Sequence, residues 1–74
     1  MKNIEIKLHS RLNPQLYDHF QDRMKYLESS IHAIHFVSPQ DIIVECDNSA
    51  DEKQINNIIM EGIEIATKVD VEFS

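Results

Sequence analysis

The segment IHAIHFVSPQDIIVEC, residues 31–46, decides how the rest of the chain must be arranged. Two runs rich in β-branched residues, 31–37 and 41–46, flank the turn-forming stretch Ser38-Pro39-Gln40. Short apolar runs on either side of such a stretch predict a β-hairpin. The hairpin is therefore the centre from which the other elements are placed.

The hairpin allows two registers, which differ in the side chains that the sheet buries. A three-residue loop pairs Phe36 with Ile42 and leaves His35 in water, whereas a two-residue loop pairs Val37 with Ile42 and buries His35. A shift of one residue turns every side chain of the strand to the opposite face. We expect the three-residue loop, because it buries the larger apolar area and no unpaired imidazole.

Upstream of the hairpin, the sequence predicts a strand followed by a helix. Ile4, Ile6 and Leu8 alternate with polar residues, which is the period of a strand with one buried face. Asn13-Pro14 then predicts a helix start, because the asparagine side chain accepts from a free backbone N–H and proline fits the first helical position. This helix should run to about residue 28. Its expected buried positions are Leu16, Phe20, Met24 and Leu27.

Downstream of the hairpin, the sequence predicts a second helix and a final strand. Ser49 and Glu52 have the spacing of a capping box, in which each side chain satisfies a free backbone N–H of the other residue. The expected buried positions of this helix are Ile55, Ile59 and Ile63. After it, Val69, Val71 and Phe73 alternate with Asp70 and Glu72, which predicts a fourth strand.

This order of elements, β-α-β-β-α-β, resembles the split βαβ arrangement called ferredoxin-like. We therefore expect an α+β fold with a four-stranded antiparallel sheet in the order 4-1-3-2. Right-handed crossovers would place both helices on one face and leave the other face open. Residues 1–74 should form a single domain, either as a stand-alone protein or as the N-terminal domain of a longer one.

Composition narrows the range of partners. The chain is 42% hydrophobic and 27% charged, which is typical of a folded domain. Its net charge of −6 repels phosphate backbones and anionic lipids, so we expect no DNA and no membrane among its partners, and RNA is disfavoured. The single cysteine excludes an internal disulfide and, with no signal-like segment, favours a cytoplasmic location.

Residues with catalytic or metal-binding chemistry do not form a recognisable motif. His32 and His35 lie three apart on a strand, so their side chains should point to opposite faces unless a bulge intervenes. Cys46 is expected to point into the core, where a thiol behaves as a small apolar group. Gly62, the single glycine, lies inside the second helix, where it predicts close helix packing rather than a nucleotide loop. We expect no enzymatic activity, no cofactor and no metal.

The leading functional hypothesis is a non-catalytic interaction or accessory domain that docks through the open sheet face. Its partner would be another protein, a second copy of the chain or the rest of a larger enzyme. The expected contact residues are His35, Val37, Ile43 and Glu45. The open face as a whole should carry these four with Glu5, Lys7, Asp70 and Glu72.

The alternative hypothesis is a regulatory module that binds a metal or a small, amino-acid-like molecule in the loop after the first strand. His9, Ser10 and Arg11 are adjacent in that loop. Arg11 has the planar, forked donor group that binds carboxylates through two parallel hydrogen bonds. The two hypotheses place the contact on different surfaces, so they can be told apart.

Overall fold

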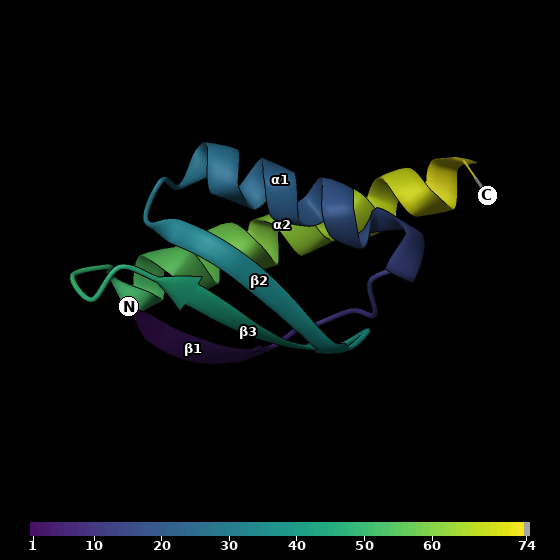
Figure 1. Ribbon diagram of the computed structural model, residues 1–74. Helices are drawn as coiled ribbons and strands as arrows, with labels where there is room; N and C mark the ends of the chain where they lie inside the picture. The colour runs from purple at the N-terminus through teal and green to yellow at the C-terminus, as the bar shows by residue number, and fades with distance from the viewer. Residues whose placement is uncertain (74) are drawn as a thin grey trace.

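A computed structural model describes the chain over residues 1–73, with side-chain surroundings described through residue 68. Along the chain, the elements are β1 (Lys2–Lys7), the 3-10 turn η1 (Pro14–Leu16), α1 (Tyr17–Leu27), β2 (Ile31–Ser38), β3 (Asp41–Cys46) and α2 (Glu52–Phe73), as Figure 1 shows. Within residues 1–73 the sheet has three strands in the order β1-β3-β2, and both neighbouring pairs are antiparallel.

Both helices lie on the same side of the sheet in Figure 1, and one hydrophobic core fills the space between the two layers. The strands contribute the buried residues Ile4, Ile6, Ile31, Ile34, Ile42, Val44 and Cys46. The helices contribute Phe20, Met24, Ile55, Ile59 and Ile63. The predicted α+β class with two helices over one sheet face is therefore confirmed.

The predicted fourth strand is wrong, and with it the ferredoxin-like sheet of order 4-1-3-2. Residues 69–73 continue α2 instead of returning to the sheet. An alternation of five residues is short, and Ile65, Val69 and Phe73 are also spaced four apart, which suits a helix equally well. No glycine, proline or asparagine between residues 63 and 73 ends the helix. Asp70 and Glu72, expected on the open sheet face, are consequently part of α2.

The hairpin adopts the predicted pairing, but the predicted three-residue loop is wrong, because Ser38 pairs with Asp41 and only Pro39 and Gln40 connect the two strands. Phe36 lies opposite Ile42, and Ile34 lies opposite Val44. The ladder has irregularities that the sequence did not reveal, one between residues 31 and 33 and one between 36 and 38. Each inserts an extra residue into β2, so Ile31 and Ile34 both point into the core although they are three apart.

Helix α1 begins close to the predicted position. The Asn13 side chain accepts a hydrogen bond from the Gln15 backbone N–H at 3.0 Å, and Pro14 opens the 3-10 turn that leads into α1. Phe20 and Met24 are buried as predicted, but Leu27 is 52% exposed. The prediction for Leu27 is wrong because α1 ends at this residue and the chain becomes extended at Glu28 on its way into β2.

Helix α2 is capped by Asp51 rather than by the predicted Ser49. The Asp51 carboxylate accepts from the backbone N–H groups of Lys53 at 2.9 Å and Gln54 at 3.4 Å. Ser49 instead lies in the preceding turn, which closes through the hydrogen bond from Ala50 N–H to the Asp47 carbonyl. The sequence placed the helix start within a few residues and misassigned the capping side chain.

Candidate interaction surface

The face of the sheet opposite the helices is exposed, and we call it the open face. It is built from the outward side chains of three adjacent strands: Glu5 and Lys7 of β1, Ile43 and Glu45 of β3, and His35 and Val37 of β2. The four contact residues predicted from the sequence, His35, Val37, Ile43 and Glu45, therefore lie together on one surface.

The centre of the open face is apolar. Val37 is 68% exposed, and Ile43 beside it is half-buried. Together with Lys7 and Asp41 they border a shallow hollow of about 340 Å³. Over residues 1–73 no helix covers this side of the sheet (Figure 1), so Val37 and Ile43 are open to solvent there.

A histidine and a glutamate form a cross-strand pair at the rim of this centre. His35 Nε2 donates a hydrogen bond to Glu45 Oε2 at 2.8 Å. His35 lies directly opposite Ile43 in the ladder, so the pair is diagonal and crosses beside the Ile43 side chain. The pair fixes the orientation of both polar groups next to the apolar centre.

The second strand histidine has a separate acidic partner. His32 Nε2 lies 2.5 Å from Asp47 Oδ1, at the end of the hairpin distant from the turn. The sequence allowed His32 and His35 to share a face only with a bulge, and β2 has one between residues 31 and 33. Even so, within the described part of the chain no three histidine, cysteine or acidic side chains come together in a way that would hold a metal ion.

Cys46 is fully buried at the end of β3. Desolvation by burial raises the pKa of its thiol above the ordinary value of 9.0, against a smaller opposing effect of the Lys2 ammonium. The thiol makes a long contact of 3.7 Å with the Lys2 carbonyl, which accepts from it. A neutral thiol inside the core is a packing group rather than a nucleophile.

The loop after β1, where the alternative hypothesis places a ligand, is anchored by backbone hydrogen bonds at its two ends. Leu8 and Leu12 are buried, and their N–H groups donate to the carbonyls of Gln40 at 2.7 Å and Pro39 at 2.8 Å. His9, Ser10 and Arg11 between them are exposed. The three hollows that we describe on residues 1–68 are lined by other side chains.

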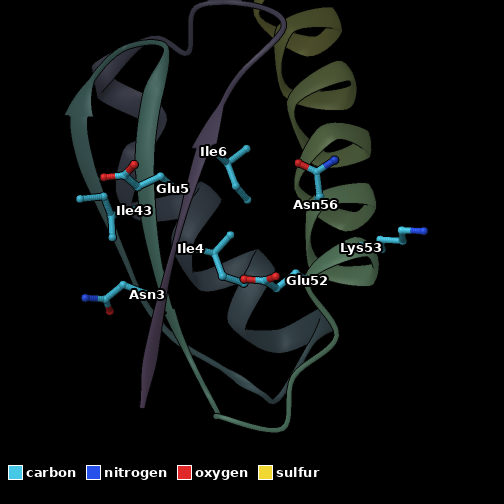
Figure 2. A pocket seen from close by; sticks show the side chains of 8 residues that line it. All are labelled: Asn3, Ile4, Glu5, Ile6, Ile43, Glu52, Lys53 and Asn56. Carbon is cyan, nitrogen blue, oxygen red and sulfur yellow. The ribbon is translucent and has the colours of Figure 1, made fainter.

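A groove that the sequence did not predict runs along the outer edge of β1. Figure 2 shows Ile4, Glu5 and Ile6 on its strand side and Glu52, Lys53 and Asn56 of α2 on its helix side. Its volume is about 660 Å³. The sequence placed β1 inside a four-stranded sheet, and the groove exists because β1 is an edge strand instead.

A third, smaller hollow of about 180 Å³ lies between the two helices. Its lining includes Phe20, Gly62 and Ile65, of which Ile65 is 51% exposed.

Over the residues that the structure describes, neither helix combines the length and the apolar character needed to cross a membrane.

Comparison with known proteins gives no family assignment. The sequence matches no protein-family model and no curated protein, and the structure matches no solved structure. The functional argument therefore depends on the geometry of this chain.

Proposed function

We propose that this chain is a non-catalytic docking domain that binds a protein partner through the open face of its sheet. The partner is a separate chain or the rest of a larger protein. One observation carries the proposal: Val37 and Ile43 form an exposed apolar centre on a sheet face that no helix covers within residues 1–73.

The arrangement around that centre supports docking to a protein. Protein interfaces combine an apolar core with a polar rim, and the rim supplies hydrogen bonds and orientation. On the open face, Glu5, Lys7 and the His35–Glu45 pair surround the two aliphatic side chains. A partner should therefore present an apolar anchor to Val37 and Ile43 and polar groups to the rim.

Other features weigh against nucleic acid as the ligand. Sheets that bind RNA stack bases on exposed aromatic rings. Here Tyr17 and Phe36 stack on each other, with ring centroids 3.9 Å apart and planes within 5°, and Phe20 packs edge-on against Phe36 from the helix side. The net charge of −6 adds a repulsive field. The buried, neutral Cys46 supports the proposal that the domain works in the reducing cytoplasm.

Site-specific photo-crosslinking tests the proposal. A photoreactive phenylalanine analogue at position 37 would report on the open face. The same analogue at position 26 is the matched control, because Tyr26 is 88% exposed on α1. We expect a defined crosslinked protein from position 37 and not from position 26. The same crosslinked protein from both positions, or from position 26 alone, would contradict docking through the open face.

A further inference from the structure

The outer edge of β1 presents unpaired backbone groups, and one hydrogen bond at the end of the strand shows which residues they belong to. Leu8 N–H donates to the Gln40 carbonyl at 2.7 Å, which is on the side of β1 that faces β3. Successive residues of a strand direct their backbone groups to alternate sides. The N–H and carbonyl groups of Asn3, Glu5 and Lys7 must therefore point away from β3, into solvent at the free edge.

A hydrogen bond at the opposite edge of the sheet, β2, agrees with this alternation. That edge also differs from β1 because it is protected from pairing with another strand. Ile34 N–H points away from β3, because it donates to Gln21 Oε1 of α1 at 2.7 Å. Val44, which lies opposite Ile34, must then direct its backbone groups toward Ile4 of β1. This agrees with the outward direction deduced for Asn3, Glu5 and Lys7. Two bulges and the Gln21 side chain interrupt the β2 edge, whereas β1 pairs regularly over its whole length.

We propose that the free edge of β1 pairs antiparallel with β1 of a second copy of this chain. The two three-stranded sheets would then join into one continuous six-stranded sheet. Charge complementarity along the edge favours a second copy as the partner. Glu5 and Lys7 are two residues apart, on the same face, and carry opposite charges.

Registers of this pairing differ in what lies opposite Glu5. If Asn3 lies opposite Glu5, the edge gains no ion pair, and if Glu5 lies opposite itself, two like charges meet at the two-fold axis. If Lys7 lies opposite Glu5, the symmetry generates the same pair twice. This register places Ile6 opposite Ile6 of the second copy, beside the groove. It is the register that the charges select.

The surroundings of the edge are compatible with this partner. Lys2, the other cation of β1, is bound within its own chain, since its Nζ donates to the Ala50 carbonyl at 2.7 Å. Glu5 and Lys7 are both exposed and therefore available to a second copy. The groove beside β1 leaves room along the edge, with α2 forming its far wall (Figure 2). β1 carries two lysines and one glutamate, so the strand is net positive and the chain's net charge of −6 arises outside it.

This inference is separate from the proposed function, because edge pairing occurs in the plane of the sheet and docking occurs on its face. Ile43→Asp, which disrupts the open face, leaves the backbone groups of β1 available. The two proposals therefore fail in different experiments.

Charge reversal with complementary variants tests the register. In the proposed register, Glu5→Lys alone would place a lysine opposite Lys7 in both cross-strand pairs. Lys7→Glu alone would place a glutamate opposite Glu5 in both pairs. We expect each to weaken self-association about tenfold or more in sedimentation equilibrium. Mixing the two variants restores both opposite-charge pairs, so a heterodimer should form with close to wild-type affinity. The double variant Glu5→Lys/Lys7→Glu should recover homodimerisation in the same way.

The matched controls are Asp22→Lys and Lys25→Glu, which reverse the same charges on the exposed surface of α1 and should leave dimerisation unchanged. Amide hydrogen exchange supplies a structural readout, because pairing should protect the Glu5 and Lys7 N–H groups as protein concentration rises. A monomeric wild type at concentrations used for NMR would overturn the proposal. A dimer whose affinity is unchanged by the charge reversals would also overturn it. So would a monomeric protein in which an unrelated extended peptide protects the β1 edge.

Discussion

Gly62 of α2 faces Met24 of α1 so closely that a Cβ atom at position 62 would lie 2.6 Å from Met24 Cε. Phe20 Cε2 would be 3.1 Å away. The two helices therefore approach each other at the one glycine of the chain, which confirms the close packing predicted for Gly62.

The Gly62 contact leads to an unusual expectation for a helix position. Glycine to alanine in a helix ordinarily gains about 1 kcal/mol of propensity. Here we expect Gly62→Ala to gain none of this and to lower the free energy of unfolding by at most about 1 kcal/mol, because Met24 Cε, the flexible end of its side chain, must move and Phe20 Cε2 must also give way. In a Met24→Ala background the two methionine contacts are removed and only Phe20 Cε2 stays close, so the same substitution should be less unfavourable than in wild type. Urea unfolding of wild type, Gly62→Ala, Met24→Ala and the double variant measures both effects. A Gly62→Ala protein more stable than wild type would contradict this packing.

Phe20 and Leu27 test the orientation of α1. The sequence pattern predicts both to be buried, but in the structure Phe20 is in the core and Leu27 is largely exposed. We expect Phe20→Ala to cost about 3–5 kcal/mol. Leu27→Ala should cost within about 0.5 kcal/mol, as is usual for surface positions. Thermal melts of the two variants provide the comparison, and equal losses would mean that α1 is rotated or extended relative to this description.

Burial of Cys46 predicts a loss of stability at alkaline pH. The pKa of the thiol is raised in the folded state, so its contribution to stability is fully present below the unfolded value of 9.0. As the pH rises above that value, the unfolded chain releases the proton first and unfolding becomes more favourable. Comparing unfolding at about pH 8 and about pH 10 should show a larger loss for wild type than for Cys46→Ala. An identical pH dependence of the two proteins would argue against a buried thiol.

The sequence predicts the centre of this fold better than its C-terminal end. In the hairpin, the pairing of Phe36 with Ile42 follows from apolar area alone, because the alternative register buries His35. The N-terminal cap at Asn13 is also local, since it depends on adjacent residues. Both predictions succeed because a few neighbouring side chains contain the whole physical reason.

Predictions that depend on distant contacts fail more often. Residues 69–73 satisfy the spacing of a strand and that of a helix, and the choice depends on whether β1 offers a better partner than continued helix. The bulges of β2 have no signal in composition, although they determine that Ile31 and Ile34 share a face. The groove beside β1 follows from the missing strand, so sequence reasoning had no means to find it.

The four predicted contact residues were found on one surface for a simple reason. Once the hairpin register is known, strand alternation places His35, Val37, Ile43 and Glu45 on the same side. The hydrogen bond between His35 and Glu45 was not predicted, because a diagonal pair depends on side-chain rotamers.

The most direct test of docking through the open face is the Kd for the protein that crosslinks to position 37. It is measured for two variants that introduce the same negative charge on opposite sides of the domain. Ile43→Asp alters the centre of the open face, and Ile65→Asp alters the exposed side of α2. If the open face docks the partner, Ile43→Asp should raise the Kd by about 30-fold or more, the equivalent of roughly 2 kcal/mol for a central interface residue. Ile65→Asp should bind like wild type. Normal binding by a correctly folded Ile43→Asp protein, with binding lost in Ile65→Asp, would contradict the account and move the contact to the helix side.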